Sequence, residues 1–292
     1  MRPASTRWLG ETLVTAPRRP PCDDRPMNRT VGAELDVTAR VESQVELQVA
    51  VAKAPGLDID DALVVTHDGR ALDVVEVPTT HHGRLHTVVL PAGPSRITYR
   101  ARVHGLAVVP ATEPADLSLH RRPSRYAESD RLGPFAAAEF AGVGPDEVLD
   151  AVSSWVGTRL DYVPGSSGPL DGAVETLLAG TGVCRDYAHL AVALLRSLGV
   201  PARLVAVYAP GCDPMDFHAV VEAHVAGGWH VVDATALAPR SSLLRIATGR
   251  DAADTAFMST VFGDVALDRS EVSAVADDGL PDDDLGQLVV LR

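Results

Sequence analysis

The stretch from Gly180 to Gly199 constrains the fold of this 292-residue chain more than any other. A glycine-rich turn ends at Cys184, and apolar residues then recur at three- and four-residue steps, which predicts an amphipathic helix. Gly199 ends that helix, and Pro201 follows it. Cys184 therefore lies in the first helical turn, where unpaired N–H groups and the helix dipole favour a thiolate. The pattern indicates a nucleophilic cysteine, with a small buried helix residue as the plainer alternative.

A second segment supplies a candidate base. Apolar residues alternate along residues 218–225, which predicts a strand with His218 on the opposite face. Glycines 227 and 228 predict a hairpin turn, and the returning strand carries Asp233. Depending on the turn, Asp233 lies opposite His218, diagonal to it, or out of reach without a bulge. The two side chains face the same side in each of these registers.

This set of residue types suits thiol chemistry. A histidine can take the proton of a cysteine, and a carboxylate can fix the imidazole tautomer and stabilise the imidazolium. Cys184, His218 and Asp233 are therefore the candidate catalytic residues. The plainer alternatives are an ordinary strand-edge histidine for His218 and a turn cap for Asp233.

Other residues of the same types fit less well. His189 lies five residues after Cys184, off the helical face of that cysteine, and His230 differs in strand parity from Asp233. Cys212 lies in a Gly/Pro-rich loop with no paired base, which indicates an incidental cysteine. We therefore exclude His189 as the base.

These segments resemble three sequence blocks of the transglutaminase-like superfamily in its bacterial form. They are the nucleophile block at residues 182–188, the histidine block at residues 218–222 and the aspartate block at residues 228–235. The resemblance extends over roughly residues 27–262. It implies a papain-like core in which Cys184 is the nucleophile, His218 the general base and acid, and Asp233 the residue that orients it.

The resemblance also has two departures. Val220 stands where the family usually has Trp, and Ala234 where it usually has Pro. Both positions belong to the wall of the site and not to the triad. The two departures therefore affect the shape of the accepted substrate more than the chemistry.

The remaining sequence predicts an α+β protein with an N-terminal antiparallel β-sandwich-like domain and a papain-like or transglutaminase-like core of helices packed on an antiparallel sheet. Strand patterns occupy residues 27–112, a connector follows at 113–134, and the catalytic core spans 135–262. Residues 263–292 form an acidic segment with a final short strand at 287–291. Residues 1–26 lack the apolar region of a secretory signal and indicate a disordered tail or a mis-assigned start.

The composition limits the classes of partner and cofactor that we expect for this protein. A net charge of −13 argues against nucleic acid or an anionic membrane and suits a cytoplasmic protein. Three cysteines form neither a disulfide framework nor a zinc spacing, so we expect no metal or cofactor. His81 and His82 are interpreted as loop residues because no carboxylate spacing accompanies them. A strand-face metal site at His218, Glu222 and His224 fails because positions i and i+4 lie about 13 Å apart.

We therefore expect a cysteine-dependent acyl-transfer enzyme that acts on amide or peptide bonds through a thioester. Hydrolysis is favoured over cross-linking because water is always available as the acceptor. Tyr187, Tyr208 and Trp229 are candidates for the substrate cleft, with core packing as their alternative. The competing hypothesis is a non-catalytic binding or scaffolding module on the same fold.

Overall fold

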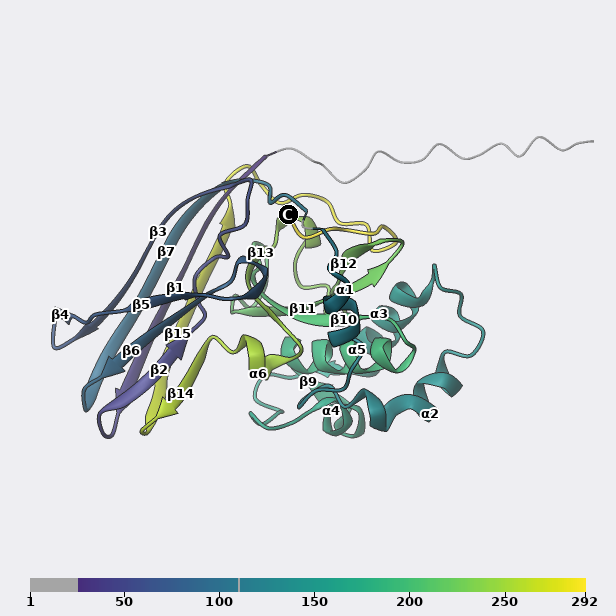
Figure 1. Ribbon diagram of the computed structural model, residues 1–292, viewed down its shortest axis with the longest axis horizontal. Coiled ribbons are helices and arrows are strands. Elements are labelled where there is room, and N and C mark those ends of the chain that lie inside the picture. Colours follow the sequence, from purple (N-terminus) through teal and green to yellow (C-terminus); the bar gives the residue numbers. More distant parts are fainter. Residues whose placement is uncertain (1–25, 110) are drawn as a thin grey trace, which may run out of the picture.

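A computed structural model describes residues 26–109 and 111–292, and it divides into a β-sandwich and a mixed α/β core (Figure 1). The predicted tail at residues 1–26 lies outside the described residues apart from Pro26. The sandwich has a five-stranded sheet in the order β15-β1-β7-β3-β4 and a four-stranded sheet in the order β14-β2-β6-β5. The strands are β1 (Met27–Ala39), β2 (Ser43–Leu47), β3 (Leu57–His67), β4 (Arg70–Ala71), β5 (Val75–Pro78), β6 (Arg84–Leu90), β7 (Gly93–Gly105), β14 (Met258–Phe262) and β15 (Val265–Ala276).

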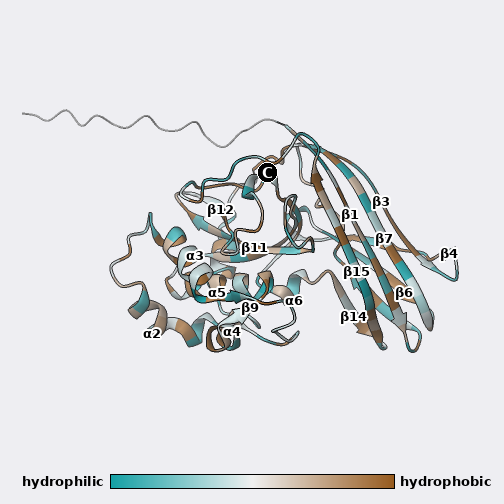
Figure 2. Cartoon of the chain, turned by 180° about the vertical axis from the view of Figure 1, so that it is seen from behind, coloured by the Kyte–Doolittle hydropathy of each residue, from teal (hydrophilic) through white to brown (hydrophobic). Residues whose placement is uncertain are grey.

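The sandwich forms because its strands alternate apolar and polar residues. Brown and teal bands mark this alternation along β1 and β7 (Figure 2). In β1 the odd-numbered residues Leu35 and Val37 are fully buried, whereas Glu34 and Asp36 on the other face are half-buried. One face of each sheet therefore enters a shared apolar core.

The C-terminal part of the chain differs from the expected domain division. We expected residues 263–292 to form an acidic segment outside the core, but residues 265–276 form β15, which pairs with β1 from Ala39↔Val265 to Arg29↔Ala276. The strand escapes sequence analysis because most of its side chains are exposed, so no apolar alternation marks it. Its charges instead pair with neighbouring strands, as Arg269 does with Asp36.

The second part is the predicted mixed core. Its antiparallel sheet has the order β12-β11-β10-β13, and helix α5 packs against β10 and β11. The predicted fold class is confirmed. The elements of this part are α1 (Pro114–Leu119), α2 (Ser129–Glu139), α3 (Val148–Arg159), β8 (Asp161–Tyr162), α4 (Ala173–Ala179), β9 (Thr181–Gly182), α5 (Cys184–Ser197), β10 (Ala202–Tyr208), β11 (His218–Val225), β12 (Gly228–Val232), β13 (Leu244–Gly249) and α6 (Ala252–Thr255), with short 3₁₀ turns η1 (Thr80–His82) in the sandwich and η2 (Arg240–Ser242) in the core.

The two parts share an apolar core. Tyr208, Leu244 and Ile246 from the core sheet are buried among the side chains of the sandwich. The Tyr208 ring stacks on Tyr99 with centroids 6.2 Å apart, and its hydroxyl donates to the Val49 carbonyl at 2.7 Å. The connector at residues 113–134 is therefore not the only link between the two parts.

The end of the chain lies along the core sheet. The Val231 N–H donates to the Val289 carbonyl at 2.7 Å, so the expected final strand runs beside β12 although it forms no regular ladder. Leu291 is buried against Val205 and Val231. Within the described ranges, none of the helices has the length and apolar character needed to span a membrane.

The Tyr208 contact gives a test of the junction. Replacing Tyr208 by Phe leaves the buried Val49 carbonyl without its donor, so we expect a loss of about 1–3 kcal/mol in the free energy of unfolding. Urea denaturation followed by circular dichroism measures it. Tyr126→Phe is the control, because that hydroxyl contacts the exposed side chain of Arg125 and its loss should cost less than about 0.5 kcal/mol. An unchanged midpoint for Tyr208→Phe would mean that the hydrogen bond contributes nothing.

Candidate active site

Cys184 is the first residue of α5, as the sequence predicts. The helix is capped by Asp186, whose carboxylate accepts the N–H of Val183 at 2.9 Å. Gly182 makes this cap possible, because a Cβ at that position would lie 2.7 Å from the Asp186 Cβ. Gly182, two residues before the cysteine, thus lets the chain approach the start of the helix closely. The Cys184 side chain, in the first turn, stays half-buried.

The residues after the cysteine fix a loop beside it. Arg185 donates to the Gly168 carbonyl and to Asp186, both at 2.9 Å, and Ser167 donates to the same carboxylate. The segment 163–171 is therefore tied to the start of α5. Sequence analysis missed Arg185 and Ser167, because their partners are brought together only by the fold.

The hairpin that carries the base and its orienter has one of the expected registers. Val225 pairs with Gly228 and Val221 with Val232, so the turn residues are Ala226 and Gly227 rather than the two glycines. Continuing this register by one pair places Asp233 opposite Val220, which is diagonal to His218. Both side chains lie on the same face, which agrees with the parity of the sequence.

The imidazole and the carboxylate meet directly. His218 Nε2 lies 2.8 Å from Asp233 Oδ2, and the two side chains are 2% and 4% exposed. Asp233 Oδ1 accepts both the N–H and the hydroxyl of Thr235, at 2.9 and 2.6 Å. The carboxylate is thus held from both sides, and it fixes the orientation of the ring.

Electrostatics favours the charged form of both partners. Burial alone would lower the pKa of His218, but the Asp233 carboxylate and the contact with Cys184 raise that pKa well above its ordinary value. Burial alone would raise the pKa of Asp233, but His218 and Thr235 lower it overall. The direction of both shifts therefore favours an imidazolium facing a carboxylate.

The thiol lies at the beginning of β11. Cys184 Sγ is 3.8 Å from the carbonyl oxygen of Phe217, the residue before His218. Because Asp233 takes Nε2, the second ring nitrogen, Nδ1, is left to interact with the sulfur. The structure thus brings the three predicted catalytic residues together in the order thiol, imidazole, carboxylate.

A fourth residue at this point was not predicted. Tyr162, on β8, pairs with Gly182 on β9, two residues before the cysteine. Burial raises the pKa of Tyr162 to about 12, and its hydroxyl interacts with the backbone N–H of Cys184. Sequence analysis did not single out Tyr162, whose only local signal is an aromatic residue two positions before Pro164.

The three aromatic residues proposed for the cleft are all buried. Tyr187 is buried and donates to the Leu160 carbonyl at 2.6 Å, whereas Tyr208 is buried at the junction with the sandwich. Trp229 is 6% exposed and lies under the guanidinium of Arg203, with its ring centroid 4.0 Å from Cζ. The core-packing alternative describes all three residues better, because each ring or hydroxyl contacts another group inside the protein.

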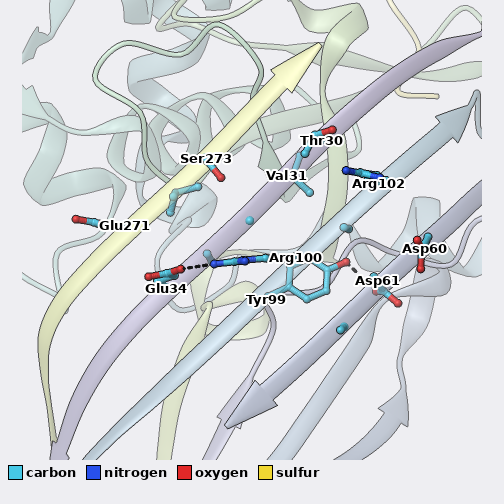
Figure 3. Close-up of a pocket in the computed structure, with 15 residues that line it drawn as sticks. Thr30, Val31, Glu34, Asp60, Asp61, Tyr99, Arg100, Arg102, Glu271 and Ser273 are labelled. Atoms are coloured by element: carbon cyan, nitrogen blue, oxygen red, sulfur yellow. Dashed lines mark hydrogen bonds and ion pairs between the residues drawn. The ribbon is translucent and has the colours of Figure 1, made fainter. Parts of the chain in front are cut away.

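One hollow of the described surface is separate from this site. A hollow of about 670 Å³ lies on the five-stranded sheet of the sandwich, where Arg100 pairs with Glu34 at 2.9 Å (Figure 3). Neither cysteine nor histidine occurs among the described residues that line it. The hollow therefore offers neither a thiol nor an imidazole.

Comparison with known proteins agrees with this arrangement. A family model for the transglutaminase-like superfamily matches residues 138–234, a range that includes Cys184, His218 and Asp233. The solved structure of a candidate cysteine protease from Cytophaga hutchinsonii is 30% identical, with a TM-score of 0.80, and the match covers 87% of this chain and 92% of that one. The chain belongs to the transglutaminase-like superfamily.

Two mycobacterial relatives of this transglutaminase-like protein are uncharacterized. One from Mycobacterium leprae is 29% identical over 126 residues, which is 40% of this chain and 45% of the relative. One from Mycobacterium tuberculosis is 35% identical over 115 residues, which is 37% of this chain and 36% of the relative. The matched region thus spans less than half the length of these relatives.

The His218–Asp233 pair predicts a pH-dependent stability. In Asp233→Asn the carboxylate no longer opposes burial, so the folded-state pKa of His218 falls below the unfolded value of about 6.5. In the wild type the pKa is raised, so protonation of His218 stabilises the fold fully below about pH 6.5, and this contribution is lost as pH rises through the folded pKa. The deficit of Asp233→Asn should therefore be about 3 kcal/mol at pH 5–6.5 and shrink at higher pH.

Urea unfolding of both proteins between pH 5 and 9 measures that deficit. Asp58→Asn is the control, because Asp58 is exposed. The free energy of unfolding of this variant should follow that of the wild type across the pH range. A deficit that stays constant with pH would contradict the charged pair.

Proposed function

We propose that this protein hydrolyses amide or peptide bonds through a thioester on Cys184. The observation that carries the proposal is the buried His218 imidazole, held by Asp233 at 2.8 Å on one nitrogen and facing the Cys184 sulfur with the other. An imidazole fixed between a carboxylate and a helix-start thiol is the arrangement that an activated cysteine requires. The likeness to a candidate cysteine protease supports the same chemistry.

The reaction has two steps. The Cys184 thiolate attacks the carbonyl carbon, and the resulting tetrahedral intermediate breaks its C–N bond as the His218 imidazolium gives its proton to the leaving amine. The acyl group is then a thioester. His218, now neutral, takes a proton from water, which attacks the thioester and releases a carboxylic acid with the Cys184 thiolate. Asp233 keeps the ring oriented throughout and stabilises each imidazolium.

The oxyanion of each intermediate needs hydrogen-bond donors. The N–H of Cys184 lies at the helix start, where it has no intrahelical acceptor. The Tyr162 hydroxyl now interacts with that N–H, so it occupies the place where the oxyanion would form. On substrate binding, the oxyanion displaces the hydroxyl oxygen from that N–H, and the displaced hydroxyl can then donate its proton to the oxyanion as a second donor.

Hydrolysis is favoured over cross-linking because water needs no second binding site. A glutamine-containing peptide library, incubated with and without a labelled primary amine, separates the two reactions. Release of ammonia or a shortened peptide supports hydrolysis, whereas incorporation of the amine supports transamidation. Turnover of neither kind, together with an unreactive thiol, would favour the binding-module alternative.

The reactivity of Cys184 is the first test. Because Cys184 lies at a helix start beside the His218 imidazole, iodoacetamide should alkylate Cys184 at pH 6 far faster than it alkylates a free thiol such as glutathione. Peptide mapping by mass spectrometry identifies the labelled cysteine. Cys184→Ala should abolish the fast labelling, whereas Cys212→Ser should retain it, because Cys212 is buried and burial raises its pKa. Labelling no faster than that of glutathione would refute the nucleophile.

Tyr162→Phe tests the oxyanion contact. The loss of one donor to an oxyanion lowers the rate of acyl transfer by roughly 10²-fold. Alkylation by iodoacetamide forms no oxyanion, so its rate at Cys184 should change little. Tyr187→Phe is the matched control, because its hydroxyl donates to the Leu160 carbonyl instead. An equal fall in alkylation and acyl transfer would show that Tyr162 acts on the thiol and not on the oxyanion.

A further inference from the structure

Three potential metal ligands meet at the junction of the sandwich and the core, away from the catalytic triad. His81 comes from η1, Asp116 from α1, and His120 follows α1 directly. One ligand atom from each lies within 4.8 Å of the others. Sequence analysis interpreted His81 as a loop residue, because the carboxylate that accompanies it, that of Asp116, lies far along the chain.

His120 is the observation that points to a ligand. Its side chain is only 2% exposed, and neither ring nitrogen has a hydrogen-bond partner among the described residues. A buried polar group without a partner is costly, so an imidazole in this state needs a bound species. Its ring is 6.4 Å from that of His81, centroid to centroid, and the two planes are tilted by 47°.

The protonation state suits a metal. Burial and the nearby Arg203 lower the pKa of His81 to about 4, and burial lowers that of His120 to about 3. Both imidazoles are therefore neutral near pH 7, which is the form that coordinates metals.

We propose that His81, Asp116 and His120 bind one divalent transition-metal ion, for which zinc is the best match. Two imidazoles with one carboxylate are a donor set that zinc accepts, whereas magnesium and calcium prefer oxygen ligands alone. Tetrahedral zinc with bonds of about 2.0–2.1 Å holds its ligand atoms roughly 3.4 Å apart, so the three groups must close by about an ångström.

Arg203 decides which ring nitrogen can bind. Its guanidinium lies 3.5 Å from His81 Nδ1 and from Asp116 Oδ2, so His81 must coordinate through Nε2, which already faces that carboxylate at 3.6 Å. The charge of Arg203 opposes a cation, but Glu222 holds it at 2.8 Å. The two positive charges of Arg203 and Arg245 are balanced by the two negative charges of Glu222 and Asp116. The metal ion would therefore bind beside four charged side chains whose net charge is zero.

The site has room for an ion and a further ligand. A hollow of about 290 Å³ is lined by His81, Asp116 and His120 and provides an approach from the surface. His81 also has a positive φ of 56°, a conformation uncommon for a residue with a side chain. A bound ion would tie the sandwich to the connector and, through Arg203, to the core sheet. The expected role is therefore a clamp across the junction.

The test uses the full chain with Cys184→Ala, so that the catalytic thiol cannot bind the metal. After removal of metals by chelation, the protein is titrated with Zn²⁺ against a chromophoric chelator. We expect one equivalent that is lost or weakened at least tenfold in His120→Gln, and also in Asp116→Asn, whose half-buried side chain is less critical for folding. His104→Gln, at an exposed histidine, should bind as tightly as the parent.

Thermal unfolding supplies a second readout. Zn²⁺ should raise the Tm of the Cys184→Ala protein and of its His104→Gln variant, but not of the His120→Gln or Asp116→Asn variants, and Mg²⁺ should raise none of them. Circular dichroism before titration shows that each variant is folded. Failure of the Cys184→Ala protein to bind zinc, or binding that persists unchanged in both ligand variants, would overturn the proposal. Neither outcome affects the alkylation of Cys184, so the metal site and the proposed function are tested separately.

Discussion

A two-residue turn sets the geometry on which the candidate active site depends. Ala226 and Gly227 have φ of 49° and 81°, and such a turn fixes the pairing of β11 with β12. In this register Asp233 falls on the face of His218. A slip by one residue would send one of the two side chains to the opposite face. Burial reinforces the register, because a buried carboxylate without its partner is strongly destabilising.

The other elements of the core each bring one group to this pair. Helix α5 supplies the sulfur, and its cap at Asp186 joins the helix start to the loop held by Arg185. Gly157 lets α3 approach the turn after β12, where a Cβ would lie 2.6 Å from the Ala234 carbonyl oxygen. The site is therefore built from rigid elements whose contacts are mostly backbone and cap interactions, and this suits a nucleophile that must meet its base without rearrangement.

Sequence analysis found the groups whose signals are local. Cys184 follows a glycine turn and starts a strongly periodic helix, and His218 and Asp233 share strand parity, so the triad could be predicted up to the choice of register. It missed Tyr162, because the β8–β9 pairing that brings it to Cys184 joins two very short strands. It missed β15 because an edge strand with both faces largely solvated carries no apolar period. Long-range pairing has no signature in a single sequence.

Strand β11 also carries the central charge of a buried ion-pair network in the core sheet. Glu222, four residues after His218, is 1% exposed and paired with both Arg203 and Arg245. Buried ion pairs add little net stability compared with apolar side chains of similar volume, so stability alone does not explain this group. Its position explains it better. Glu222, Arg203 and Arg245 lie on three neighbouring strands of the core sheet, β11, β10 and β13, and Arg203 also covers Trp229 and reaches Asp116 on α1. The charges thus tie the core strands to one another and to α1, whereas the apolar contacts around Tyr208 hold the sandwich against the core.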